Sequence, residues 1–442
     1  MTHRSHLTWR RKVLAAAAIV TVAGTLAACS SPAKSTAKST GGTTISIWAV
    51  SAGTDQPLLN AATAFDKATG NTININFLPN SDAGKQKVTI AMAGNNPPTI
   101  LMNSGGSALQ QYVSAKSVEP INTIMKSYPN WQKSFVSGGF GPVTIGGKVY
   151  GVPLLGSEPI MIFYSKPLYK QLGLKVPKTM TQLLSNAAAV KKAGQIPFAL
   201  GNSEGWPGLA WEEMLVDRYG GPQVMDKILA GDSSEWKNSA FIKANTLIQK
   251  MAKDGYFQPG YTSVDYSNGE PNALMYTNKA SMQLMLNFLV TQMQTQSPSY
   301  LKANDLGWFA FPTVSGGKGN PNDEAGNVGQ YALVTSASSA KQKAVAAAFL
   351  ATELPKPTHI KQMLSAGEVP LIAGTDKYVD ASGVSAFTKF TANLVSKAPA
   401  YQLSWDAALP ASVGQTLLTD LEDVFALKMT PQQFSTAMAA AK

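Results

Sequence analysis

The sequence is poor in the residues that nucleophilic and metal-dependent enzymes use. It holds one cysteine, Cys29, and three histidines, of which His3 and His6 stand near the N-terminus. One cysteine excludes a disulfide framework within the chain. The remaining histidine, His359, makes neither a Ser-His-Asp triad nor a histidine-rich zinc site by itself. The glycines form neither a P-loop nor a dinucleotide-binding fingerprint. We therefore expect no catalytic residues, no metal and no cofactor.

Charged residues are also scarce, and they are scattered. Asp, Glu, Lys and Arg make up 14% of a chain whose formal net charge is +11. Close basic pairs such as Lys191 and Lys192 are few, whereas nucleic-acid-binding proteins cluster such residues on one face or one helix. We therefore expect no nucleic-acid partner. Beyond the N-terminal region, no apolar run approaches the roughly 18 residues that suggest a membrane helix.

The first 43 residues have the pattern of an exported and lipid-anchored precursor. A basic segment at 1–12 precedes an apolar stretch at 13–26, and the letters LAAC end at Cys29. This order is typical of a secretory signal peptide, and LAAC resembles a bacterial lipobox, in which the cysteine becomes the lipidated first residue. We expect a signal peptide at 1–28, a flexible tether at 29–43, and an anchor of palmitate-type chains on Cys29 at the outer face of the cell membrane. The general and the twin-arginine export routes both remain open.

From residue 44 onward, strand and helix patterns alternate. TTISIWAV (43–50) and NTININFLP (71–79) alternate apolar and polar residues as strands do, and apolar residues recur at helical spacing over 58–65 between them. Strand, helix and strand in this order indicate a parallel α/β unit. Further along, Thr179 and Gln182 have the spacing of a capping box and predict the start of a helix. The fold class expected is α/β.

Aromatic residues stand beside polar ones in places that look like loops. Examples are Trp206 in SEGWPG, Phe288 in LNFLV and Trp405 in YQLSWDAALP. A pyranose ring has an apolar face that packs on an aromatic ring, and its hydroxyls need carboxylate, amide or hydroxyl partners. The alternative is burial in a core, where tryptophans contribute a large apolar area. As a set, these residues favour a ligand cleft. Glu158 and Asp406 are in addition candidates for the two carboxylates of a glycosidase.

The order of motifs over residues 44–442 resembles the extracellular solute-binding proteins of ABC importers, in the sugar-binding family that includes maltose-binding protein. The most specific resemblance lies at 145–200, where GKVYGVP, YSKP and PKT follow the family order and spacing. KVTIAMAGNNPPTILMNSGG, NKASMQLMLNF and DLGWFAFPTVSGG resemble further family segments. Thr99, Ser165 and Met180 depart from the family at positions expected to be structural. Leu286 and Phe288 replace a glycine and a tryptophan in a segment expected at the cleft.

The resemblance implies a two-lobe fold of the type II periplasmic-binding-protein kind, with three crossings between the lobes and a hinge. It places the N-lobe at 44–153 and 313–369 and the C-lobe at 154–312 and 370–442. A proline stands at each expected crossing, at Pro153, Pro312 and Pro370. A solute would be captured between the lobes by hinge closure and delivered to the permease subunits of an ABC transporter. The chain is expected to act as a monomer.

The resemblance also implies which residues contact the ligand. The expected contacts from the N-lobe, mostly to hydroxyls, are Trp48, Asn103, Ser104, Gln330 and Tyr331. Those from the C-lobe are Glu158, Trp206, Asn287, Phe288, Trp405 and Asp406, where the rings of Trp206, Phe288 and Trp405 stack and the carboxylates accept hydroxyl bonds. The expected ligand is a mono- or oligosaccharide. A polyol or glycerophosphodiester ligand, a secreted glycosidase-like hydrolase and a solute-sensing lipoprotein of the same fold stay open as alternatives.

Overall fold

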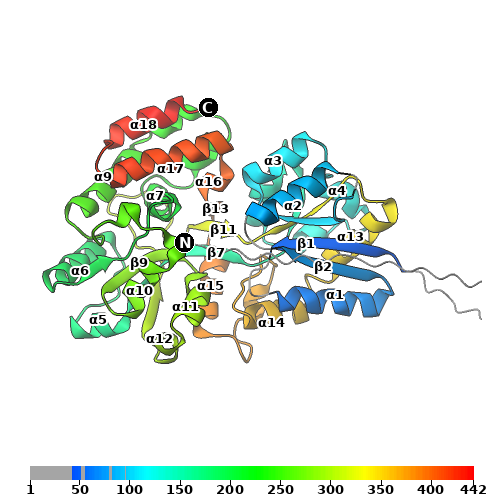
Figure 1. The fold of residues 1–442 in the computed structure, drawn as a ribbon, viewed down its shortest axis with the longest axis horizontal. Helices are drawn as coiled ribbons and strands as arrows, with labels where there is room; N and C mark the ends of the chain where they lie inside the picture. The colour runs from blue at the N-terminus through cyan, green and yellow to red at the C-terminus, as the bar shows by residue number, and fades with distance from the viewer. Residues whose placement is uncertain (1–41, 51–54, 79–81, 95) are drawn as a thin grey trace, which may run out of the picture. The chain divides into compact units, whose positions relative to one another are not determined.

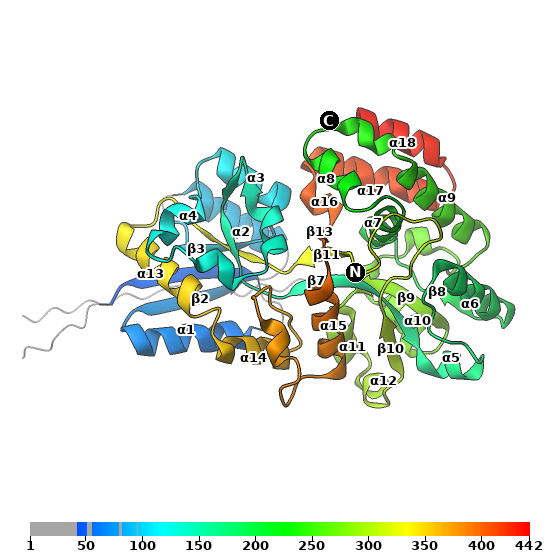
Figure 2. The ribbon, with the colours of Figure 1, turned by 180° about the vertical axis from the view of Figure 1, so that it is seen from behind.

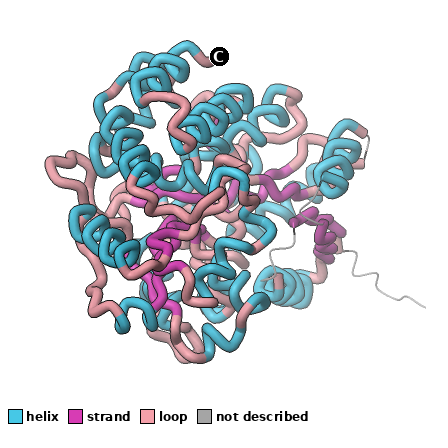
Figure 3. Tube along the Cα trace, turned by 60° about the vertical axis from the view of Figure 1, so that its left-hand side comes forward, coloured by secondary structure: helices cyan, strands magenta, loops and turns pink. Residues whose placement is uncertain are grey.

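The computed structural model describes residues 42–50, 55–78, 82–94 and 96–442. The predicted signal peptide and Cys29 lie outside the described residues, as does the tether up to residue 41. Helices surround the strands throughout the described chain (Figure 3), which confirms the α/β class. Within those ranges, no helix has both the length and the apolar character needed to cross a membrane.

The first of two large sheets is built mainly from the N-terminal part of the chain (Figure 1). Its strands lie in the order β2 (Thr72–Leu78), β1 (Thr44–Val50), β3 (Ile100–Asn103), β12 (Tyr331–Val334) and β6 (Gly151–Pro153). β1 pairs in parallel with β2 and β3, and α1 (Gln56–Thr69) connects β1 to β2. The predicted parallel strand–helix–strand unit is therefore confirmed.

The first core lies around this sheet and includes Ile45 and Ile47 of β1, both almost fully buried. Figure 2 shows α13 and α4 near β3 from behind. The other elements of this part are α2 (Asp82–Ala93), α3 (Gly106–Ser114), α4 (Ile121–Ile124), η1 (Met125–Ser127), η2 (Trp131–Ser134), η3 (Ser137–Val143), the hairpin of β4 (Thr144–Ile145) and β5 (Lys148–Val149), α13 (Ala340–Thr352), α14 (Pro357–Ser365) and η7 (Thr375–Tyr378).

The second sheet lies in the order β13 (Tyr401–Leu403), β11 (Glu324–Val328), β7 (Ser157–Ser165), β9 (Ala280–Leu286) and β8 (Ile196–Phe198), with β10 (Leu306–Phe309) pairing along the later part of β7. Every residue of β9 is buried, as expected for a central strand covered on both faces. The second core is built around this sheet.

Helices enclose the second sheet, and α17 and α18 pack against α9. They are α5 (Lys166–Gln171), α6 (Met180–Lys192), α7 (Trp206–Gly220), α8 (Gln223–Leu229), η4 (Ser233–Lys237), α9 (Ser239–Lys253), η5 (Tyr261–Ser263), η6 (Tyr266–Asn268), α10 (Glu270–Tyr276), α11 (Leu289–Gln296), α12 (Pro298–Lys302), α15 (Ala386–Lys397), α16 (Trp405–Ala408), α17 (Ala411–Phe425) and α18 (Pro431–Ala440). The predicted capping box is confirmed at α6, because the Thr179 hydroxyl accepts from the Gln182 N–H and the Gln182 side chain accepts from the Thr179 N–H, both at 3.3 Å.

Within the described residues the chain passes between the two sheets three times, from β6 to β7, from β11 to β12 and from β12 to β13. Two passages differ from the expected positions. The crossing expected at 311–313 comes later, at 329–330, because β11 pairs with β7 and β13 in the second sheet. The crossing expected near Pro370 also comes later, because Leu371 and Ile372 pack in the first core. Strand pairing and apolar burial set these two passages, and Pro312 and Pro370 do not mark them, whereas Pro153, the last residue of β6, directly precedes the first passage.

Candidate functional site

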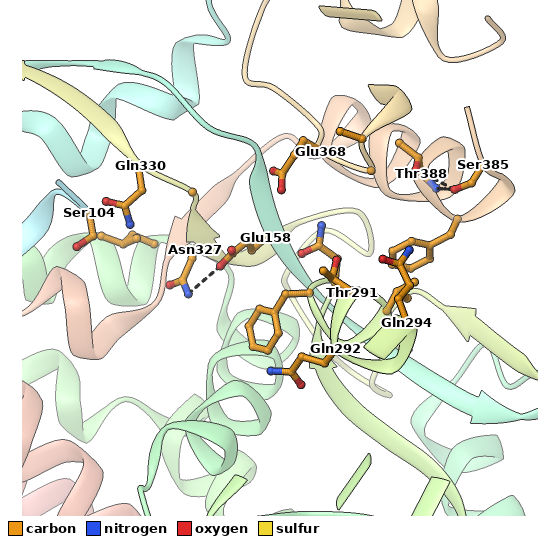
Figure 4. A pocket seen from close by; sticks show the side chains of 18 of the residues that line it. Ser104, Glu158, Thr291, Gln292, Gln294, Asn327, Gln330, Glu368, Ser385 and Thr388 are labelled. Carbon is orange, nitrogen blue, oxygen red and sulfur yellow. Dashed lines mark hydrogen bonds between the residues drawn. The ribbon is translucent and has the colours of Figure 1, made fainter. Parts of the chain in front are cut away.

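A cavity of about 670 Å³ lies between the two sheets. Polar side chains reach it from both sides, with Ser104 and Gln330 next to strands of the first sheet, and Glu158 and Asn327 on strands of the second (Figure 4). All four side chains lie at or next to the ends of strands, and these strand ends border the cavity. Six of the predicted ligand contacts line it, namely Ser104, Glu158, Asn287, Phe288, Gln330 and Asp406.

Glu158 on β7 is the best-defined polar group of the cavity. Its Oε2 accepts a hydrogen bond from Asn327 Nδ2 at 3.2 Å (Figure 4), since the two residues face each other across β7 and β11. Burial raises the pKa of Glu158 to about 7; the Asn327 bond opposes this rise and the nearby Glu368 carboxylate adds to it. Near neutral pH the Glu158 carboxyl group is therefore present in both protonation states and either donates or accepts a hydrogen bond.

Asn287 and Phe288 follow the end of β9. The Asn287 amide nitrogen donates to the carbonyl oxygen of Ser157 at 3.3 Å, while its buried Oδ1 has no hydrogen-bond partner in the structure. A buried acceptor without a donor costs about 1–3 kcal/mol, so a ligand hydroxyl or amine would stabilise it. The half-buried Phe288 ring lies 6.3 Å from Trp206 and 6.2 Å from Tyr266, which makes an aromatic cluster beside the cavity.

Asp406 reaches the cavity from the short helix α16. Its Oδ1 accepts from the Ala407 N–H at 2.9 Å, and burial raises the pKa of its carboxyl group. The two residues before Asp406, Ser404 and Trp405, are held by hydrogen bonds to a fully buried side chain. Glu213 of α7 accepts hydrogen bonds from the Trp405 N–H at 2.7 Å and from the Ser404 hydroxyl at 2.8 Å. The position of Asp406 therefore depends on a buried neighbour of its helix.

Two predicted ligand contacts are core residues instead. Trp405 is 1% exposed and packs 5.7 Å from the Phe241 ring in the second core. Tyr331 is 0% exposed, and its hydroxyl donates to the carbonyl oxygen of Gly139 at 2.6 Å. Neither has side-chain surface to offer a ligand, which corrects the stacking role expected for Trp405 and the hydroxyl contact expected for Tyr331. For Trp405, the alternative of burial in a core is therefore the correct one.

Three further predicted contacts are not among the described lining residues. Asn103 uses its amide inside the loop after β3, where it accepts from the Gly105 N–H at 2.8 Å and donates to the Ala108 carbonyl at 3.4 Å. Trp206 packs edge-to-face on Tyr266 at 5.1 Å, behind Phe288. The Lys87 Nζ lies over the Trp48 ring, 5.4 Å from the ring centroid. Their ligand contacts stay predictions.

Several lining residues were not predicted from the sequence. They are Thr291, Gln292, Gln294, Asn327, Ser385 and Thr388, which bring amide and hydroxyl groups, together with Glu368 and Phe387. Asn327 was identifiable only through its register opposite Glu158. The residues of α11 and α15 carry no local pattern that separates them from any polar helix surface. No group of three or more His, Cys, Asp or Glu side chains able to hold a metal occurs in the described part of the chain.

A second cavity of about 840 Å³ lies beside the first, between α3 and the hairpin β4–β5 on one side and α8, β13 and α16 on the other. Its lining includes apolar side chains such as Met225, Ile228 and Leu409. None of the predicted site residues lines it. The polar cavity at Glu158 is therefore the candidate site.

Residues 48–352 match the family model of the bacterial extracellular solute-binding proteins. The chain belongs to this family. A curated relative, the multiple sugar-binding protein of Streptococcus mutans, is 26% identical over 252 residues, which make up 56% of this chain and 57% of that protein. The match thus covers a little over half the length of that relative, and 54% of the length of a second curated relative, an ABC transporter extracellular-binding protein of Pyrococcus horikoshii. Membership in the family agrees with the predicted binding role and export.

Solved structures of similar proteins confirm the fold. One comes from work on xylan utilization by the thermophilic bacterium Caldanaerobius polysaccharolyticus; it has a TM-score of 0.74 at 27% identity and covers 90% of this chain and 99% of its own. A chitin oligosaccharide binding protein has a TM-score of 0.69 at 21% identity, covering 90% and 97%. The two-lobe α/β fold of the type II binding proteins is confirmed, and below, the parts built on the first and second sheets are called the N-lobe and the C-lobe.

Proposed function

We propose that this chain is the substrate-binding protein of an ABC importer and captures a mono- or oligosaccharide between its lobes. The observation that carries the proposal is the cavity between the two sheets, whose lining is polar and comes from both. Family membership supports solute binding. The sugar-binding and oligosaccharide-binding names of similar proteins support a carbohydrate as the solute.

The chemistry of the lining suits a carbohydrate. Carboxylates, amides and hydroxyls surround the space and match a ring edge of hydroxyl groups, while the Phe288 ring offers an apolar surface for the face of a sugar. Carboxylates and amides accept or donate in the bidentate manner that vicinal hydroxyls need. Specificity for one sugar would follow from which of these groups each hydroxyl meets.

Closure follows from the same arrangement. A ligand shifts an equilibrium toward the closed state only through contacts that it gains there. Ser104 and Gln330 border the cavity from the N-lobe, and Glu158 and Asp406 border it from the C-lobe. A sugar touching both groups would therefore draw the lobes together around the three connecting passages. The closed form would then deliver the sugar to the permease subunits.

The same proposal includes a lipid anchor on Cys29, attachment to the outer face of the membrane and action as a monomer. The anchor is tested by feeding cells a labelled palmitate analogue. We expect label in the wild-type chain and none in a Cys29→Ala variant, which should appear in the medium. Label retained by Cys29→Ala would reject the proposed attachment site.

Binding is tested by recording the melting temperature of residues 42–442 with a panel of mono- and oligosaccharides. A ligand bound only by the folded state stabilises it by about 2.7 kcal/mol at a hundredfold excess over Kd. A shift with one class of sugar supports the proposal. The same mixtures are then analysed for cleaved products, since cleavage that is lost in Glu158→Gln would instead support the hydrolase alternative. A flat panel on folded protein would contradict carbohydrate binding.

A further inference from the structure

The charge of the cavity is opposite to the charge of the chain. The chain carries a net charge of +11, yet the described lining includes the carboxyl groups of Glu158, Glu368 and Asp406 and no lysine, arginine or histidine. The short segments 51–54 and 79–81, outside the description, contain no charged residue in the sequence, whereas Asp82 and Lys85, whose side chains are also outside the description, carry one charge of each sign. The described lining is thus acidic on a basic protein.

The hydrogen-bonding groups of the cavity are also unbalanced. Asn287 is only 8% exposed, and its Oδ1 is a buried acceptor without a partner. Each of the two asparagine amides uses one of its two N–H donors, since Asn287 donates to the Ser157 carbonyl and Asn327 donates to Glu158. At Asn287 both lone pairs of Oδ1 remain against one N–H, so its unused capacity is mainly acceptor capacity, which a ligand rich in N–H and O–H groups would satisfy.

An ammonium group meets both conditions. It has three donors and no acceptor, and hydrogen bonds between ionised partners are roughly twice as strong as neutral ones. A carboxylate or phosphate on the ligand would instead bring more acceptors and a like charge close to three carboxyl groups. Burial within the protein strengthens both the attraction and the repulsion relative to water.

Building on the proposed carbohydrate function, we propose that the cleft selects its ligand by charge. It binds an amine-bearing, cationic sugar more tightly than the neutral sugar of the same ring, and it binds the corresponding uronate most weakly. The selection comes from Asp406 and Glu158 facing the ligand, with Glu368 contributing to the field. A charge-neutral cleft of the same shape would not order the three forms in this way.

The test uses sugars matched at every position except C6. Residues 42–442 are titrated calorimetrically at pH 7 with glucose, 6-amino-6-deoxyglucose and glucuronate, with the same three forms of galactose, and with cellobiose and its 6′-amino and 6′-carboxylate forms. Spermidine is included as a cation without a sugar ring. For the ring that binds, we expect the amine form to bind about tenfold or more tightly than the uronate form.

Two isosteric variants locate the source of the selection. Asp406→Asn and Glu158→Gln each remove an ionisable carboxyl group and keep the side-chain shape, so each should lower the ratio of amine to uronate affinity about threefold or more. Glu270→Gln is the matched control, because Glu270 is an exposed acidic residue of α10 outside the cavity. Its ratio should equal that of the wild type. Equal ratios in all four proteins would overturn the assignment to these residues.

The outcomes separate the selection from the carbohydrate function. Uronates that bind as tightly as the amines would overturn the charge selection and leave sugar binding intact. Binding of spermidine with no binding of any sugar would support the charge selection and overturn the carbohydrate ligand. Absence of binding to every compound by folded protein would overturn both.

Discussion

One carboxylate oxygen of Glu213 accepts hydrogen bonds from the Trp405 N–H at 2.7 Å and from the Ser404 hydroxyl at 2.8 Å. Glu213 lies on α7 and is completely buried. The next residue along α16, Asp406, lines the cleft. A fully buried residue thus positions a carboxyl group that faces the cavity.

Replacing Glu213 tests this link. Glu213→Leu removes the acceptor of two donors and should lower the free energy of unfolding by about 1–3 kcal/mol for the Trp405 N–H alone. It should also weaken ligand binding, because the start of α16 loses its support. Glu213→Gln keeps an acceptor oxygen at nearly the same place and is the matched control. Urea denaturation and calorimetric titration measure the two effects.

The two variants must differ for the link to hold. If Glu213→Leu binds the identified sugar as the wild type does, then Asp406 is positioned by other contacts. Equal losses of affinity in the leucine and glutamine variants would mean that an acceptor oxygen at this position is not sufficient to position Asp406.

Tyr331 provides the converse prediction, a residue that affects stability without affecting binding. Tyr331→Phe removes the hydroxyl that donates to the Gly139 carbonyl and should lower the free energy of unfolding by about 0.5–1.5 kcal/mol. The Kd for the ligand should not change, because the ring is buried in the first core. Tyr276→Phe, at a half-buried ring of α10, is the control and should change neither quantity. A clear rise in Kd for Tyr331→Phe would restore the predicted ligand contact.

Of the aromatic ligand contacts predicted from the sequence, Phe288 is the one that lines the described cavity. Phe288→Ala removes a half-buried ring at the cavity and should raise the Kd for a sugar by about three- to tenfold, since aromatic packing contributes about 0.5–1.5 kcal/mol beyond the buried area. Phe288→Tyr keeps the ring and should bind nearly as the wild type does. Tyr276→Ala controls for the loss of a half-buried ring elsewhere. An unchanged Kd in Phe288→Ala would show that the sugar does not stack there.

The elements of the fold were predictable because their signals are local. The alternation in β1 and β2, the helical spacing in α1 and the Thr179–Gln182 capping box each act over a few residues, and all three are confirmed. The passages between the sheets were less predictable. Where β11 pairs depends on β7 and β13, which lie far from it in sequence.

The site was predictable for residues at strand ends and not for those chosen by packing. Glu158 lies at the start of β7, and Asn287 and Ser104 directly follow β9 and β3, so sequence position and geometry coincide. Trp405 and Phe288 look alike in sequence, each an aromatic residue beside a polar one. Only tertiary packing, such as that of Trp405 on Phe241, separates the core residue from the half-buried one.

The buried acid next to Glu213 leads to a prediction about pH. Glu212 is fully buried on α7, and burial raises its pKa to about 8 against 4.5 for the free side chain, with Asn245 opposing the rise. Between these values the folded chain holds a proton that the unfolded chain has lost. The free energy of unfolding should therefore fall as the pH rises through this window, by up to about 1.4 kcal/mol per pH unit for such a group.

Glu213, whose pKa is also raised to about 8, contributes in the same direction, so the test isolates Glu212 by difference. Glu212→Gln replaces the protonated acid with a neutral group of the same shape. Its free energy of unfolding, measured in urea at pH 5, 6, 7 and 8, should decline less steeply than that of the wild type. Glu270→Gln, at an exposed position, should follow the wild-type slope. Parallel curves for Glu212→Gln and wild type would mean that Glu212 ionises in the fold as freely as in the unfolded chain, and the buried α7 would then have to supply a counter-charge.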